Sequence, residues 1–209
     1  VWNHWSIDRF PVSYFNCGFA DLVFAWGKLN EGYFNAHNFK YEFIVQTGIV
    51  AGEKHSHKDL IKANFIKSKF NNSIDYIITV FDSTFDKHVY QSETNMIIFY
   101  EKILRFIDEK NNVGLLFKPK GNYFKKLNKS KLINDYIKKY KSEERLIILD
   151  DYEAKPSEVA LSADLCISFG INTVGIFSSF NGIPSIHIDL SGNIEHPFYY
   201  LGLENKIIF

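Results

Sequence analysis

From residue 74 onward, short apolar runs alternate with longer segments of helical periodicity, and this alternation most restricts the fold of the chain. Residues 74–81 form the first such run, are rich in β-branched and aromatic residues, and have polar neighbours on both sides, which predicts a strand. The runs are continuously apolar and do not alternate with polar residues, as expected for a sheet that is covered on both faces. Further strands are predicted at 114–118, 146–149, 163–168, 184–188 and 206–209.

The segments between these runs predict helices. Ser92 is a suitable N-cap, and apolar residues follow it at spacings of three and four. Other helices are predicted at 123–140, from Pro156, and at 173–181. Strands joined by helices of this length form right-handed parallel crossovers. The predicted fold class is therefore α/β, a doubly wound, mainly parallel, Rossmann-like sheet.

Residues 1–50 have a different pattern, with two strand-like pieces at 22–26 and 43–47 among loops rich in Asn, Gly and aromatic residues. We interpret residues 1–52 as the end of a preceding α/β domain and the crossover, and 53–209 as a nucleotide-binding domain. Both Val1 and Phe209 lie inside sequence that is typical of structured protein, so we expect the chain to be part of a longer one.

Composition excludes some function classes. Lys+Arg and Asp+Glu both number 24, and this balance argues against a general nucleic-acid binder, which carries a basic excess. Two cysteines do not make a disulfide scaffold, and Cys166, in an apolar run, is expected to be a buried thiol. No apolar stretch approaches the ~20 residues that span a bilayer.

The most informative segment is residues 163–189, ADLCISFGINTVGIFSSFNGIPSIHID. A strand is followed by a tight turn at Gly170 and then by Asn172 and Thr173, which open a helix. Outward-facing N–H groups at a positive helix end bind anions, the Thr173 hydroxyl would assist them, and Gly175 would let a phosphate come close. The alternative is that Asn172 is only a helix cap and Gly170 only a turn.

Polar residues follow two other predicted strands. Asp82, Ser83 and Thr84 come after the first strand, where Rossmann-like folds hold phosphates, although the G-x-G-x-x-G signature is absent. Lys118 and Lys120 follow the second strand and could serve a phosphate as point charges. A polar turn and a solvated basic turn are the respective alternatives.

A fourth candidate lies after the fifth predicted strand, in residues 193–200. Glu195 could bind ribose or sugar hydroxyls, and His196 could contact a phosphate or act as acid or base. A structured aromatic loop is the alternative. His55 and His57, with Glu53, lack the spacing of a zinc site, so no metal site is predicted.

The run Ala-Asp-x-x-Ile-Ser … Asn-Thr-x-Gly … Gly-Ile-Pro-Ser-Ile-x-Ile-Asp, from Ala163 to Asp189, resembles the C-terminal domain of GT-B glycosyltransferases. It is similar to bacterial surface-polysaccharide enzymes, namely CDP-glycerol glycerophosphotransferases and CMP-Kdo or CMP-sialic acid transferases. In that group the second strand commonly ends in Lys-Pro-His-Pro, whereas this chain has Lys-Pro-Lys-Gly at 118–121, which weakens the expectation of a CMP-linked donor.

The resemblance implies a transferase that uses a nucleotide-activated sugar donor and a glycan or lipid-linked acceptor, without a metal or other cofactor. It implies a cytoplasmic location, with peripheral association at the inner face of the membrane. The catalytic base of such enzymes comes from the other domain, and His4 and Asp8 are the candidates here. Transfer activity is expected to need that domain in full. A non-hydrolysing UDP-sugar 2-epimerase and a non-catalytic nucleotide-binding module are the alternatives.

Overall fold

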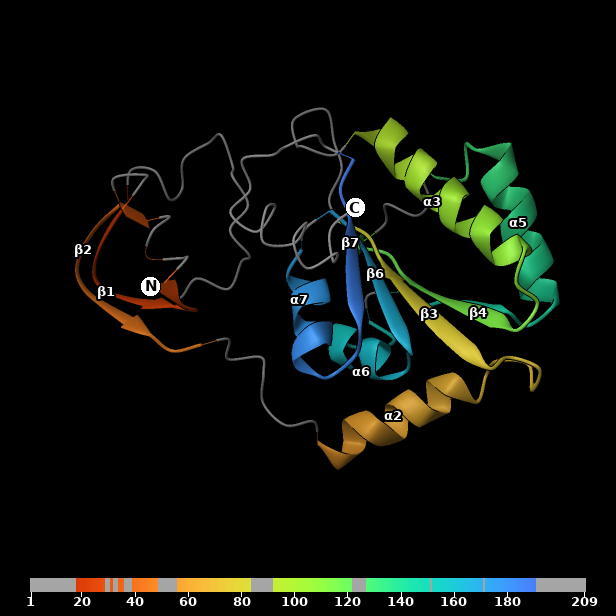
Figure 1. Cartoon of the computed structure of the whole chain (residues 1–209), viewed down its shortest axis with the longest axis horizontal. Helices are drawn as coiled ribbons and strands as arrows, with labels where there is room; N and C mark the ends of the chain where they lie inside the picture. The colour runs from red at the N-terminus through yellow and green to blue at the C-terminus, as the bar shows by residue number, and fades with distance from the viewer. Residues whose placement is uncertain are drawn as a thin grey trace.

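Among the residues that it describes, the computed structural model contains two parallel sheets, one of five strands and one of two (Figure 1). Elements are labelled as in that figure. The described residues are 18–28, 31, 34–35, 39–48, 56–83, 92–121, 127–150, 152–170 and 172–190.

The five-stranded sheet has the order β5-β4-β3-β6-β7, and all its strand pairs are parallel. The chain order thus reverses direction at the central pair, β3 and β6, which is the arrangement of a doubly wound Rossmann-like sheet. The predicted fold class is confirmed. The sixth predicted strand, 206–209, lies outside the described residues. The strands are β3 (Tyr76–Phe81), β4 (Val113–Lys118), β5 (Leu146–Ile148), β6 (Leu165–Phe169) and β7 (Ser185–Ile188).

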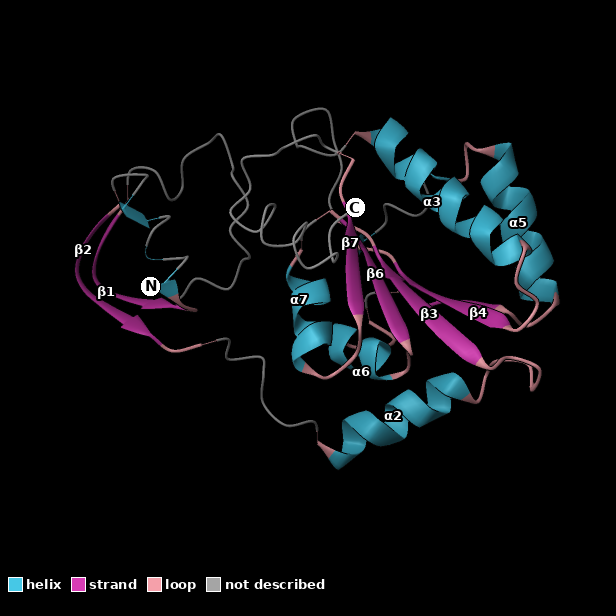
Figure 2. Cartoon of the chain, in the orientation of Figure 1, coloured by secondary structure: helices cyan, strands magenta, loops and turns pink. Residues whose placement is uncertain are grey.

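Helices cover both faces of this sheet (Figure 2). Two of them, α3 and α5, pack on one face; α2, α6 and α7 pack on the other. Successive residues of β3 point to opposite faces, so Ile78 and Val80 belong to the α3–α5 core while Ile77 and Phe81 belong to the other. The helices are α2 (His57–Lys67), α3 (Glu93–Asp108), α5 (Lys131–Ser142), α6 (Pro156–Leu161) and α7 (Thr173–Phe180).

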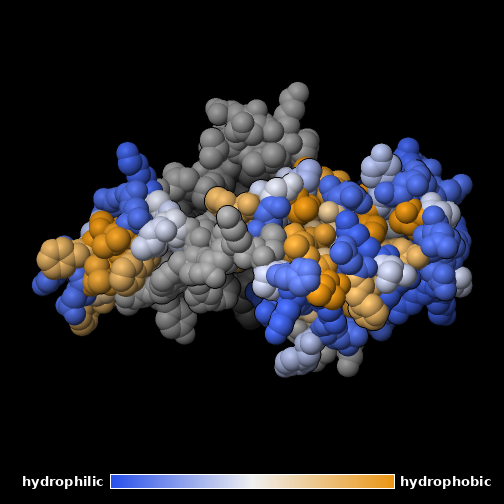
Figure 3. Space-filling view, turned by 90° about the horizontal axis from the view of Figure 1, so that it is seen from below, coloured by the Kyte–Doolittle hydropathy of each residue, from blue (hydrophilic) through white to orange (hydrophobic). Residues whose placement is uncertain are grey.

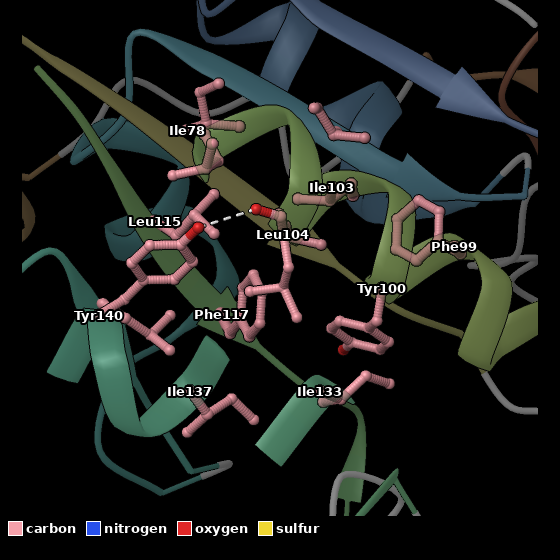
Figure 4. Packing of buried hydrophobic residues seen from close by; sticks show 14 of the residues in the cluster. Ile78, Phe99, Tyr100, Ile103, Leu104, Leu115, Phe117, Ile133, Ile137 and Tyr140 are labelled. Carbon is pink, nitrogen blue, oxygen red and sulfur yellow. Dashed lines mark hydrogen bonds between the residues drawn. The ribbon is translucent and has the colours of Figure 1, made fainter. Parts of the chain in front are cut away.

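The α3–α5 core is rich in aromatic side chains (Figure 4). Tyr100 meets Phe117 edge to face, with ring centroids 5.1 Å apart. The buried hydroxyl of Tyr140 donates to the carbonyl of Leu104 at 3.0 Å, which joins α5 to α3. The polar end of each tyrosine thus has a partner inside an otherwise apolar layer. On the opposite face of the sheet, Cys166 is buried as predicted, and burial raises the pKa of its thiol to about 11.

Helix starts follow the capping residues. The Ser92 hydroxyl accepts the N–H of Asn95 at 3.1 Å, as predicted, and Pro156 lies in the first turn of α6. The predicted helix 123–140 is not continuous, because residues 128–130 are not helical. Within the described residues, α5 begins at Lys131 because the Ser130 hydroxyl accepts the N–H of Ile133 at 3.4 Å and caps the helix there.

The two-stranded sheet pairs β1 (Phe19–Ala25) with β2 (Lys40–Gln46) in parallel. Both strands begin three residues before the predicted pieces at 22–26 and 43–47. Trp26, directly after β1, lies against Phe177 of α7 with ring centroids 5.9 Å apart, so the two sheets are connected by a side-chain contact. The proposed domain division, 1–52 and 53–209, stays a prediction.

Arg145 joins three elements on the α3–α5 side of the main sheet. Its buried guanidinium donates to the carbonyls of Ile107 at 3.0 Å and Val113 at 3.3 Å, and also to that of Lys110. The same group lies over the Tyr140 ring, 5.1 Å from its centroid. One side chain therefore provides hydrogen-bond donors for backbone carbonyls at the end of α3 and at the start of β4.

We predict that Arg145→Met lowers the free energy of unfolding by about 3 kcal/mol, because it leaves buried carbonyls without a donor. Arg105→Met is the matched control, since Arg105 is exposed on α3 and should change stability by no more than about 0.5 kcal/mol. Urea unfolding followed by circular dichroism measures both. Equal stability of the two variants would contradict this role of Arg145.

Candidate functional site

The candidate site lies at the edge of the main sheet where its parallel strands end. Phe81, the last residue of β3, pairs with Ser168 of β6 and with Lys118 of β4. The segments that follow these three strands therefore leave the sheet side by side. This places Asp82, Lys118 and the turn at Gly170 along one edge, at the point where the strand order reverses. Ligands of doubly wound sheets bind at such points.

The turn after β6 and the start of α7 have the predicted local structure. Gly170 has a φ of 70°, which favours glycine, and it lets the chain leave β6 sharply. The Asn172 side chain accepts the N–H of Gly175 at 3.0 Å and donates to the carbonyl of Phe169 at 3.3 Å. Asn172 is thus a helix cap and also holds the turn. The first turn of α7 contains no acidic residue, so nothing there opposes an anion.

Two buried polar side chains lie beneath this turn, and both were missed by the sequence analysis. Ser168 and His187 are paired across β6 and β7, on the face that α7 covers. His187 Nδ1 lies 3.1 Å from the carbonyl oxygen of Gly170. Because a carbonyl only accepts, Nδ1 carries the proton and donates, which secures the turn from below.

The Ser168 hydroxyl is fully buried and has no hydrogen-bond partner in the part of the chain that the structure describes. Ser185 has a second such hydroxyl, but it lies beside the Cys166 thiol. Buried polar groups in folded proteins are nearly always paired, so an exception calls for an explanation. A ligand that binds at the start of α7 is one explanation for Ser168.

Only glycine fits at position 175, because the Ser168 and His187 side chains lie directly against it. A Cβ atom at this position would lie 2.5 Å from Ser168 Oγ and 2.5 Å from His187 Cε1, and neither contact is tolerable. The sequence analysis attributed the glycine to the approach of a phosphate. The packing supplies a different reason, which is that α7 must come close to β6 and β7.

Asp82 and Lys118 tie neighbouring loops together. The buried Asp82 carboxylate accepts from the Tyr100 hydroxyl at 3.2 Å and from the backbone N–H of Lys120. Burial first, and then the charge of Asp82, raises the pKa of Tyr100 well above its usual range. The buried Lys118 ammonium donates to the carbonyl of Asp150 at 2.6 Å, which joins β4 to the loop after β5. Lys118 is therefore not the solvated basic turn that was the alternative to a phosphate contact.

Other predicted site residues cannot be placed. His4, Asp8, Thr84, Glu195 and His196 lie outside the described residues. Ser83 is half-buried directly after Asp82. Within the part of the chain that the structure describes, no three His, Cys, Asp or Glu side chains gather as they would around a metal ion.

The sequence held one signal for the missed pair. His187 stands between Ile186 and Ile188 in a run expected to be a buried strand, and a histidine there needs a polar partner. Ser168 had no comparable signal, because a serine at a strand end is common. Only the pairing of β6 with β7 brings the two together.

We predict that Ser168→Ala raises the free energy of unfolding by about 1 kcal/mol, because it removes a buried hydroxyl that has no partner. Ser162 provides the matched control. It is equally buried, but its hydroxyl bonds the carbonyls of Ala63 at 3.2 Å and Glu158 at 2.8 Å, so Ser162→Ala should lower stability by about 1 kcal/mol. Urea unfolding measures both, and a loss of stability in Ser168→Ala as large as in Ser162→Ala would contradict the prediction.

Comparison with solved structures supports the fold. The chain is similar to the N-terminal domain of trehalose-6-phosphate phosphatase from Candida albicans, with 14% sequence identity and a TM-score of 0.51. The similarity covers 91% of this chain and 48% of the other, so this chain spans about half the length of that structure. At this identity the likeness concerns the fold alone.

Comparison of sequences identifies the family. No curated protein matches the chain. Residues 17–202 match the family described as polysaccharide biosynthesis PFTS motif protein, and this match includes both sheets and the start of α7. A contiguous Pro-Phe-Thr-Ser does not occur in this sequence. The match spans most of the chain, which therefore belongs to the polysaccharide biosynthesis PFTS motif family and has its role in polysaccharide biosynthesis.

Proposed function

We propose that this chain is the nucleotide-binding part of a GT-B glycosyltransferase, or of a glycerophosphotransferase of the same architecture, that acts in polysaccharide biosynthesis. The observation that carries the proposal is the start of α7. A capped helix end lies at the reversal point of a doubly wound sheet, above a buried serine hydroxyl without a partner. Family membership supports the polysaccharide context, and the donor and the reaction are our inference.

The start of α7 suits a phosphate for three reasons. Backbone N–H groups in the first turn of a helix have no intrahelical acceptor and point toward its end. The helix dipole adds partial positive charge there, and the first turn of α7 itself carries no acidic side chain. The Ser168 hydroxyl lies under the same turn, as its position against Gly175 indicates, and it can donate to a phosphate oxygen.

The proposed chemistry follows from this position. In sugar transfer, the bond between the sugar's anomeric carbon and the donor phosphate oxygen breaks, and that oxygen gains negative charge. Donors at the helix end stabilise this charge as it develops. The acceptor hydroxyl bonds to the carbon and loses its proton to a base. His4 and Asp8 remain the predicted candidates for that base.

The loops after β3 and β4 have a supporting role in this proposal. The Lys118 ammonium is buried and bonded to the carbonyl of Asp150, and Asp82 accepts from the Lys120 N–H, so these residues hold the neighbouring loops together at this edge of the sheet. Replacing Lys118 should thus reduce stability as well as binding. A loss of binding in Lys118→Ala at unchanged stability would favour direct contact with the phosphate.

We predict that the chain binds a nucleoside mono- or diphosphate, and that Thr173→Val and Ser168→Ala each weaken binding roughly tenfold through the loss of one hydrogen bond to a charged group. Calorimetric titration with CMP, CDP, UDP and GDP measures the affinity for each nucleotide and shows which nucleobase the site prefers. Lys138→Ala, on the exposed side of α5, is the control and should bind like the wild type.

Unchanged binding in both hydroxyl variants, with the fold intact, would rule out the α7 site and leave Asn172 as a cap only. A second assay separates the function classes. Because transfer is expected to need the complete acceptor-side domain, this assay incubates nucleotide-sugar donors and an acceptor glycan with a protein that contains that domain. Release of a 2-epimer of the sugar, without transfer, would indicate a UDP-sugar 2-epimerase. Donor binding without any turnover would indicate a non-catalytic nucleotide-binding module.

A further inference from the structure

The surface of α2 combines exposed apolar side chains with lysines. Leu60, Ile61 and Phe65 are 45%, 56% and 54% exposed. The helix is anchored by its other side, where Ala63 and Ile66 are buried against the main domain. Both sides of α2 are therefore apolar, and only one of them is used by the fold. Figure 3 views the molecule from the side on which α2 lies and shows apolar residues among hydrophilic ones.

Most of the charged residues on this helix and directly after it are lysines. Four lysines lie on α2 or within two residues of its end, at 58, 62, 67 and 69. The only acidic residue of the helix, Asp59, is half-buried and is engaged in a capping box with Ser56. The chain as a whole has no net charge, so this is a local concentration of positive charge.

Lysines also lie close to the exposed aromatic ring. The ammonium groups of Lys62 and Lys69 lie 5.7 Å and 4.9 Å from the centroid of the Phe65 ring. Ile61 is one helical turn before Phe65, so the two apolar side chains point to the same side. The surface thus has an apolar centre that could insert between lipids and ammonium groups that could meet headgroup phosphates.

We propose that this surface of α2, defined by Lys58, Ile61, Lys62, Phe65 and Lys69, docks on an anionic lipid bilayer. Among the described residues no helix has both the length and the apolar character to cross a membrane, so the contact is a peripheral one. A second copy of the chain fits this surface less well. In a symmetric dimer the same patch faces itself, and the lysines of the two copies would repel each other.

The test is flotation of the full chain with vesicles of phosphatidylcholine alone or of phosphatidylcholine mixed with phosphatidylglycerol. We expect binding to the mixed vesicles only. Ile61→Ser/Phe65→Ser should reduce it by at least about tenfold, and each lysine changed to alanine by roughly fivefold. Added salt should weaken the binding of the wild type, because the lysine contribution is electrostatic.

Ile98→Ser/Phe106→Ser is the matched control. It changes the same residue types on α3, which covers the opposite face of the sheet. Ile98 is 41% exposed and Phe106 is 49% exposed. This variant should float like the wild type. Light scattering on all three proteins reports the oligomeric state, and thermal unfolding confirms that the variants fold.

Three results would overturn the proposal: no flotation of the wild type, equal loss in both double variants, or a wild-type dimer that Ile61→Ser/Phe65→Ser makes monomeric without a change in flotation. The outcome is independent of the nucleotide site. Ile61→Ser/Phe65→Ser should bind nucleotide like the wild type, so failure of one proposal leaves the other standing.

Discussion

The parallel pairing of β3 with β6 is the constraint on which the rest of the structure depends. These strands are adjacent in space but far apart in sequence, and β4 and β7 extend the sheet outward from them on either side. Each crossover must be right-handed, so the helices on the two sides of the pair cover opposite faces. The chain therefore leaves β3 and β6 toward opposite faces of the sheet, and ligands of doubly wound sheets bind at such a point. Both the start of α7 and the buried Asp82 lie at this edge of the sheet.

The start of α7 is locally unfavourable to the fold in a way that fits a binding site. The fold loses stability through the buried Ser168 hydroxyl, which has no hydrogen-bond partner among the described residues. On the other face of the sheet, by contrast, the buried polar groups of Arg145 and Tyr140 are hydrogen-bonded. Proteins commonly deviate from such rules where they bind ligands. The contrast between these two parts of one domain supports the proposed position of the nucleotide.

Nucleotide binding and membrane docking are assigned to different parts of the molecule. The proposed nucleotide site lies at the carboxyl edge of the sheet. The proposed docking surface is the outer side of α2, whose inner side packs with α6 in the core on that face of the sheet. A polysaccharide enzyme with a lipid-linked acceptor would gain from both, because docking would hold the donor site near the acceptor. The two proposals reinforce each other but rest on separate observations.

The sequence by itself determined the fold class, most of the strands of the main sheet and the cap at Asn172. These features follow from local patterns, namely apolar runs, helical periodicity and the hydrogen-bonding capacity of short polar side chains. The prediction of one helix over 123–140 did not identify Ser130 as the N-cap of α5, because serine also occurs inside helices and in loops. The structural roles of Lys118 and Gly175 could not be predicted from the sequence either. Only the tertiary structure decided that Lys118 is bonded to the carbonyl of Asp150, and that Gly175 makes room for Ser168 and His187. The physical reason is that these contacts join strands distant in the chain, and sheet register, which no local pattern encodes, selects which side chains meet.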